Sequence, residues 1–339
     1  MFVRPHGPEG GAMTAEAGAG PRRPRRVTHA DIARACGVSR ATVSYVLNDV
    51  PGRVISEATR ELVLRTAREL GHVPYAPARM LRLGRSDVVL ALVRDFSPGY
   101  ISNALLRKLD VALAERGFVL LIHRYDESLR SVQELWQLVS PSLVVVMGGL
   151  TISEQEGLEL TATRVLRVHG TMPNARIGRM QADHLTTKGH RVLGYVLPSE
   201  PSLQLIATER LRGLQEECAQ LGIPQPVVCT VDPADPESVT AALDVFLASE
   251  GLTAVATHND DIGLMLVSAM RARGLEAGRD LAVIGVDNIP SARLDLTTVE
   301  IDVDLWGDDV VASALALLDD VEPQPTSHEL LRVIERHTA

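Results

Sequence analysis

Side chains that suit contact with a nucleic acid lie close together in one short run: Ser39, Arg40, Ala41, Thr42, Ser44 and Tyr45. Arginine reaches O6 and N7 of guanine with two hydrogen bonds, alanine touches the thymine methyl group, and tyrosine stacks or donates one hydrogen bond. Serine and threonine hydroxyls suit phosphate oxygens, above all at a helix N-terminus. This chemistry requires that the six residues share the exposed face of one helix.

Three short helices are predicted around this run. The first begins after Thr28, which forms a capping box with Asp31, and ends at Gly37, where a sharp turn needs a positive φ. The second is expected over 40–47 and the third over 56–71, each opened by a serine cap. Two short helices joined by a tight turn, with a third packed across them, predict a helix-turn-helix whose second helix enters the major groove.

Charge is distributed unevenly along the 339 residues, whose formal net charge is -9. Residues 21–85 hold 13 arginines, no lysine and 5 acids, which gives +8 and leaves -17 for the rest of the chain. Residues 1–26 are rich in Gly, Ala, Pro and Arg and are expected to form a disordered basic tail. A basic end on an acidic body favours a nucleic-acid partner.

Several other classes of protein are disfavoured. The 3 cysteines form no C-x-x-C pair, and the chain begins without a signal peptide and holds no membrane-spanning apolar run, so a cytoplasmic protein with no membrane contact is expected. No G-x-G-x-x-G fingerprint after a strand, Walker loop, H-E-x-x-H or G-x-S-x-G occurs, and the histidines lack metal-ligand spacing. We therefore expect no enzyme, cofactor or metal.

The helix-turn-helix region carries a long, ordered set of family motifs. They lie at 27–33, 37–44, 46–48, 54, 56, 59–60, 69–71, 74, 76, 78–79, 81–82 and 84–85. These stretches closely resemble the LacI/GalR family of transcriptional regulators. The resemblance implies DNA contacts by Thr28 and Asn48 in addition to the six residues above. Tyr45 stands where many members carry Arg or another polar reader, so the base preferred at this contact differs from the common one.

The resemblance implies a second DNA contact at the hinge over 72–85. In the family, this segment folds into a short helix on the operator and enters the minor groove. Leu81 matches the residue that wedges into the central base step, and Arg79 and Arg82 flank it. An apolar wedge unstacks the step and kinks the duplex, while arginines read the negative groove. The alternative is a plain linker.

From residue 87 onward, apolar runs alternate with helical segments. Strands are expected at 88–93, 118–122, 143–147, 165–168, 192–196, 253–256 and 282–286. Continuous apolar strands separated by helices predict buried parallel sheets. Motifs at 184–185, 189–191, 210–213, 259–260, 284–288 and 296–299 extend the resemblance, which implies a two-lobed α/β body like a periplasmic binding protein.

Effector-binding residues follow from the same resemblance. Arg210, Asn259 and Asp287 are the candidates to hydrogen-bond an effector in the cleft between the lobes, and the loop with Phe96 and Ser97 would form another wall. Alternatively, Asn259 and Asp287 are turn residues or helix caps.

Two departures weaken a sugar as the effector. The segment between the strand at 165–168 and the helix expected at 180–185 is shorter than in most members of the family. It also lacks the Asp that lines the cleft in those members. Aromatic residues make up only 3%. A different polar metabolite, a remodelled pocket or the absence of an effector are the alternatives.

The expected domains are a tail over 1–26, an all-α helix-turn-helix domain over 27–71, a hinge over 72–85 and the body over 86–339. Lobe 1 is placed at about 86–180 and 291–318, and lobe 2 at about 181–290 and 319–339. The expected function is repression from a pseudo-palindromic double-stranded operator by a homodimer under control of a small polar metabolite. The alternatives are a secreted solute-binding protein and an α/β metabolic enzyme.

Overall fold

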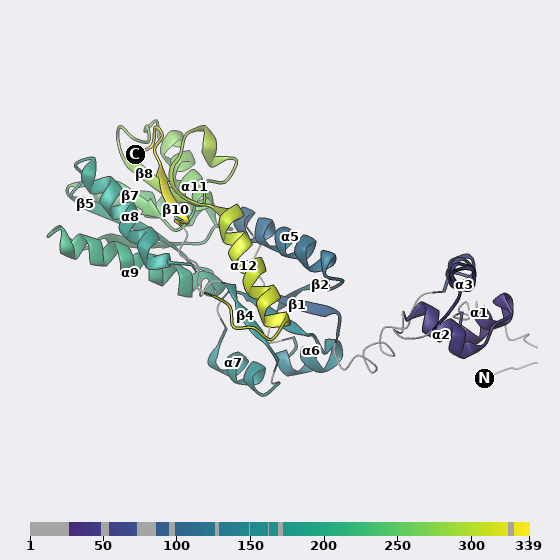
Figure 1. Ribbon diagram of the computed structural model, residues 1–339. Coiled ribbons are helices and arrows are strands. Elements are labelled where there is room, and N and C mark those ends of the chain that lie inside the picture. Colours follow the sequence, from purple (N-terminus) through teal and green to yellow (C-terminus); the bar gives the residue numbers. More distant parts are fainter. Residues whose placement is uncertain are drawn as a thin grey trace, which may run out of the picture. The chain divides into compact units, whose positions relative to one another are not determined.

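A computed structural model describes residues 27–48, 54–72, 86–94, 99–125, 129–148, 150–161, 163–168, 172–324 and 329–339. The chain divides into two compact units, Met1–Arg82 and Leu83–Ala339, called the head and the body below (Figure 1). The basic tail, most of the hinge and the loop with Phe96 and Ser97 lie outside the described residues.

The described part of the head consists of three helices. They are α1 (His29–Cys36), α2 (Arg40–Leu47) and α3 (Glu57–Glu69). Each starts at a side-chain cap: the hydroxyls of Thr28, Ser39 and Ser56 accept hydrogen bonds from the third backbone amide beyond them. The helices pack around a small core that includes Ile32 and Val43. The three helices predicted from the sequence are confirmed.

The first lobe of the body is built on a four-stranded parallel sheet in the order β2-β1-β3-β4. Its strands are β1 (Val88–Arg94), β2 (Val119–Tyr125), β3 (Leu143–Met147) and β4 (Val165–Arg167). Two helices cover each face: α5 (Tyr100–Glu115) and α12 (Val303–Leu318) on one, α6 (Val132–Val139) and α7 (Ile152–Glu159) on the other. The strands alternate their apolar side chains between these two helical layers.

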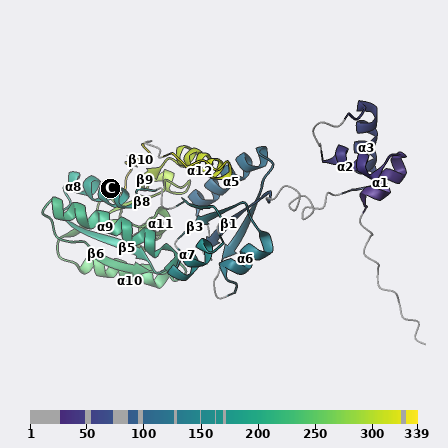
Figure 2. The same ribbon diagram turned by 60° about the horizontal axis from the view of Figure 1, so that its bottom comes forward.

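The second lobe is built on a six-stranded sheet in the order β10-β9-β8-β7-β5-β6. Its strands are β5 (Val192–Pro198), β6 (Val227–Val231), β7 (Leu252–Thr257), β8 (Ala282–Val286), β9 (Thr297–Ile301) and the antiparallel β10 (Leu331–Ile334). On one face lie α8 (Asn174–Thr187) and α9 (Gln204–Gln220), and on the other α10 (Pro236–Ala248) and α11 (Asp260–Ala272) (Figure 2). The predicted two-lobed α/β body is confirmed.

The expected division of the lobes needs a correction. The sequence places residues 291–318 in the first lobe, but β9 pairs with β8 and β10 in the second sheet, and only α12 packs on α5 in the first lobe. The β-branched run at the start of β9 extends the ladder of β8, which holds it in the second lobe. Helix α8 also lies wholly on the second sheet beside α9, so the break at 180 falls inside a helix.

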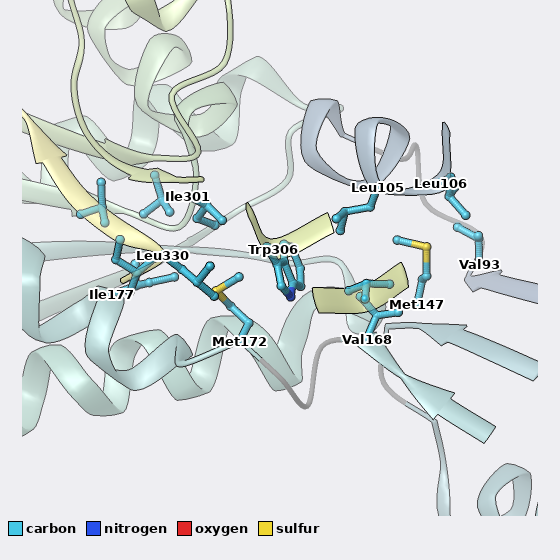
Figure 3. Close-up of a cluster of buried hydrophobic side chains, with 14 of the residues drawn as sticks. Val93, Leu105, Leu106, Met147, Val168, Met172, Ile177, Ile301, Trp306 and Leu330 are labelled. Carbon is cyan, nitrogen blue, oxygen red and sulfur yellow. The ribbon is translucent and has the colours of Figure 1, made fainter. Parts of the chain in front are cut away.

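One apolar core runs through both lobes. Side chains of the first sheet and of α5 belong to the same buried cluster as those of α8 and the second sheet. Figure 3 shows Trp306 of α12 in the middle of this cluster, with Met172 and Leu330 on one side and Leu105 and Met147 on the other. Trp306 is only 2% exposed, so its burial ties the two lobes together.

Candidate functional site

The turn between α1 and α2 is short because Gly37 reverses the chain. Its φ of 68° lies in the left-handed region, and its amide donates to the carbonyl oxygen of Ala33. Ser39 then starts α2 after only two residues. Thr28 and Asp31 form the predicted capping box, with the Thr28 amide 2.9 Å from Asp31 Oδ2. Local chemistry therefore fixes both ends of α1 and the beginning of α2.

Helix α2 has one buried face and one face available to a partner. Val43 and Val46 are buried against the other two helices. Arg40 and Ala41 are exposed, and the side chains of Thr42, Ser44 and Tyr45 are half-buried. The Arg40 guanidinium forms no hydrogen bond or ion pair with the described residues. This face can present the donors and the methyl group that major-groove reading requires.

Several of the predicted phosphate-contact groups also act as local caps. The Ser39 hydroxyl lies 3.0 Å from the Thr42 amide, and Asn48 Nδ2 donates to the Ser44 carbonyl oxygen at 2.7 Å. These bonds hold the side chains in defined orientations at the two ends of α2. The predicted contacts Arg79, Leu81 and Arg82 lie outside the described residues.

Arg210 occupies the interior of the second lobe. It lies on α9, is only 6% exposed, and donates from Nε to Asn174 Oδ1 at 3.2 Å and from Nη1 to the His258 carbonyl oxygen at 2.5 Å. Its position depends on a close crossing of α8 and α9: a Cβ on Gly178 would overlap the Arg210 carbonyl, and one on Gly213 would overlap the Ala175 carbonyl. The two glycines thus let the helices approach far enough to bring Arg210 to Asn174.

Asn259 caps α11, as the alternative interpretation of this residue expected. Its Oδ1 accepts a hydrogen bond from the Ile262 amide at 3.0 Å. The side-chain amide nitrogen donates to no described residue, so the cap leaves a donor for another partner.

Asp287 follows the end of β8 with a φ of 109°, in the left-handed region. Burial raises the pKa of this carboxyl to about 6. The positive charge of Arg210 opposes the increase, and the negative charge of Asp261 adds to it. Arg210 and Asp287 therefore share one electrostatic environment, although no ion pair joins them.

Asp260 is a buried carboxyl that sequence reasoning did not single out, although it stands next to Asn259 in a matched motif. Its Oδ1 accepts from the Thr298 hydroxyl at 2.6 Å and its Oδ2 from the Ile289 amide at 2.9 Å. Burial raises its pKa to about 7, and the neighbouring Asp287 adds to the increase. The bonds join α11 to the loop after β8 and to β9.

A cavity of about 330 Å³ lies between the lobes. Its polar lining comes from Gln155 and Arg167 of the first lobe and from Asn174 and Glu209 of the second. Arg210, Asn259 and Asp287 do not line it, but Arg210 is bonded directly to Asn174 in its wall. Arg167 and Asn174 were not among the residues predicted from the sequence, although Arg167 stands at the end of a predicted strand, where ligand-binding residues of α/β sheets are found.

In the described part of the chain, no group of three or more His, Cys, Asp or Glu side chains is placed to hold a metal ion. Among the same residues, no helix is both long and apolar enough to cross a membrane.

Two sequence families match separate parts of the chain. Residues 28–75 match the bacterial regulatory proteins of the LacI family, and residues 182–339 match a periplasmic binding protein-like domain. Their order along the chain, together with the three-helix head and the two-lobed body, decides the assignment. The chain belongs to the LacI family.

Regulators of the LacI family resemble this chain over most of its length. The transcriptional regulator GalS of Salmonella typhimurium is 29% identical over 80% of this chain and 84% of its own. The regulator CelR of Thermobifida fusca is 28% identical over 93% of this chain and 97% of its own. Both are named as transcriptional regulators of the helix-turn-helix type.

Solved structures share the fold. A Lac repressor dimer bound to operator and the anti-inducer ONPF aligns with a TM-score of 0.77 at 21% identity, over 93% of this chain and 99% of the other. A CelR–cellobiose complex aligns with a TM-score of 0.64 at 23% identity, over 93% of this chain and all of the other. The matched LacI-family head, together with relatives named as transcriptional regulators, identifies this chain as a DNA-binding transcriptional regulator.

Proposed function

We propose that this chain represses transcription by binding a pseudo-palindromic operator as a homodimer, in the cytoplasm and at the nucleoid, under the control of a small polar metabolite. The observation that carries the proposal is the exposed face of α2 within a head that matches the LacI family. A secreted solute-binding protein would need only the body, so the presence of a DNA-binding head argues against that alternative.

In this proposal, Arg40 reads a guanine and Ala41 packs against a thymine methyl group. Tyr45 stands at the position where the residue differs among family members and sets which base is preferred. Thr28, Ser39, Thr42, Ser44 and Asn48 contact phosphates or bases at the two ends of α2 and at the start of α1. The guanidinium of Arg40 is exposed and has no partner among the described residues, which supports its assignment as the main reader. Arg79, Leu81 and Arg82 stay proposed minor-groove contacts on the basis of sequence alone.

We propose that two chains pair through the body, because the edge strand β2 has exposed apolar side chains. This strand lies at the edge of the first sheet and exposes Val119, Leu121 and Ile122 to 62%, 43% and 51%. An edge strand with exposed apolar side chains is an aggregation hazard unless a partner covers it. A second copy of the chain covers it in our proposal, which also pairs two heads for the two halves of an operator.

The metabolite is proposed to bind in the cleft between the lobes. CelR was solved with cellobiose and the Lac repressor with ONPF, and both align with this chain over both lobes. Arg210, Asn259 and Asp287 are the proposed effector residues, together with Phe96 and Ser97. Binding there changes the closure of the lobes and thereby the affinity of the head for DNA. We propose no catalytic role for these residues, in keeping with relatives named as regulators.

An electrophoretic mobility shift assay tests the proposal. The full chain is titrated onto labelled promoter fragments in the presence of excess non-specific DNA. A regulator retards a particular palindromic fragment, whereas a solute-binding protein or an enzyme retards none. Equal retardation of every fragment would contradict sequence-specific repression.

A further inference from the structure

The cavity between the lobes has an unpaired positive charge in its wall. Arg167, at the end of β4, is exposed and forms no hydrogen bond or ion pair with the described residues. Glu209, the acid in the described lining, is already paired with Arg212 at 2.7 Å. The balance of charge presented to a small molecule in this cavity is therefore positive.

A second arginine lies directly behind the cavity wall. Asn174 lines the cavity, and its Oδ1 accepts from Arg210 Nε at 3.2 Å. Arg210 is buried, yet its hydrogen bonds go to a neutral amide and a neutral carbonyl, and it forms no ion pair with a carboxylate of the described residues. Buried charges are normally paired, because desolvation without a counter-charge is costly. The site behind Asn174 thus has positive charge that no nearby acid neutralises by direct contact.

Asp287 offsets this charge only in part. It interacts with Arg210 electrostatically but forms no ion pair with it, and it does not line the cavity.

The rest of the lining suits a small hydroxylated molecule, and its described residues offer no aromatic ring for such a molecule to stack on. Gln155 and Asn174 supply side-chain amides, Met172 and Leu205 supply apolar contact, and no aromatic ring belongs to the described lining. A volume of about 330 Å³ lies at the lower end of the range for small-molecule sites.

We propose that the effector of this regulator carries an anionic group, a carboxylate or a phosphate, which Arg167 binds in the cavity while Arg210 adds positive potential from behind Asn174. This inference rests on the proposed function, in which the effector binds between the lobes. Charge-assisted hydrogen bonds from an arginine to either anion are strong and directional, which suits Arg167 to both.

Inorganic phosphate and acetate serve as minimal probes. The melting temperature of the full chain is recorded against each sodium salt, with sodium chloride added to hold the ionic strength constant, because a ligand that binds only the folded state raises it. The wild type should be stabilised in a saturable manner by at least one of the two ions. A stronger effect of phosphate would indicate a phosphate ester as the effector, and a stronger effect of acetate a carboxylate. No stabilisation beyond that of chloride would overturn the proposal.

Two variants locate the binding. R167Q should weaken the apparent affinity for the ion by about tenfold or more, the loss expected for one charged hydrogen bond. R164Q removes an equal charge immediately before the same strand, where Arg164 is half-buried and paired with Asp320, and should leave the affinity unchanged. Equal affinities of the two variants would overturn the assignment to Arg167. Specific DNA binding by the same wild-type sample is scored separately: its loss contradicts the proposed function, whereas intact DNA binding without ion binding contradicts only the anionic effector.

Discussion

Gly178 of α8 packs against the backbone carbonyl of Arg210 in α9 so closely that no Cβ atom fits between them. The contact sets the separation of the two helices at the point where Arg210 reaches across to Asn174 and to the His258 carbonyl. The absence of a side chain at this point of α8 is therefore what allows the Arg210 side chain of α9 to be buried.

Replacing this glycine should destabilise the body. Gly178→Ala forces two helix backbones apart, and overpacking of this kind costs about 1–3 kcal/mol. Gly157→Ala is the matched control, because it also lies inside a helix but its Cβ would meet only Gln133 Cγ at an ordinary 3.8 Å. The control should gain about 0.5–1 kcal/mol from better helix propensity. Urea unfolding of both variants measures the difference, and equal stabilities would contradict the close crossing.

Arg40→Ala should relax base specificity at one position of each half-site. The loss of a bidentate contact to guanine costs about 1–3 kcal/mol at that base pair. Arg65→Ala is the control, since it removes the same charge from the exposed face of α3, where Arg65 lies 3.8 Å from Glu69. Fluorescence anisotropy with operators substituted at single positions measures the effect. An equal loss of affinity for every sequence would show that Arg40 contacts only phosphates.

The stability of the protein should fall as the pH is raised through neutrality. The pKa of Asp260 is raised from an ordinary 3.8 to about 7 in the folded chain, so its contribution is fully present below pH 3.8 and is lost as the pH rises through about 7. Asp287, with a pKa of about 6, acts in the same direction. Urea unfolding midpoints between about pH 5.5 and 8 should therefore decline.

Asp260→Asn should flatten that decline, because an amide can keep both bonds: Oδ1 accepts from the Ile289 amide and Nδ2 donates to the Thr298 hydroxyl. Asp320→Asn is the control. The pKa of exposed Asp320 is lowered by Arg164, so its titration falls below the range of the experiment. An unchanged slope in the Asp260 variant would place the titration elsewhere.

Ile122→Lys should separate the dimer. The Ile122 side chain is 51% exposed on the edge strand β2, and a lysine buried there against a second copy would be left unpaired. Leu221→Lys, at the exposed end of α9, is the control. Sedimentation equilibrium should give a monomer only for Ile122→Lys, together with weaker operator binding. A dimer of unchanged affinity would exclude β2 as the contact.

Local chemistry made the head and the central strands predictable. Thr28, Gly37 and Ser39 determine the helix ends by bonds to residues close in sequence, and apolar runs such as 143–147 become fully buried strands. The edge strand β6 was not predicted, because Thr230 interrupts its short apolar run and all its side chains except Val231 are half-buried or exposed.

The candidate ligand site was predictable only in part. Arg210 came from the family motif, but its partner Asn174 lies 36 residues away and meets it only through the crossing of α8 and α9. The burial of Asp260 likewise depends on Thr298 and Ile289, which arrive from β9 and the loop before it. Contacts of this kind follow from tertiary packing and leave no local pattern in the sequence.

Selection of bound sites from random double-stranded DNA tests the central claim most directly. The full chain is incubated with the library, the bound fraction is amplified and sequenced, and the affinity of the recovered motif is measured against a scrambled duplex. A LacI-type regulator should recover two inverted half-sites and bind them about 10³-fold or more tightly than the scrambled duplex. Recovery of no motif, or equal affinity for both duplexes, would contradict sequence-specific DNA binding by this chain.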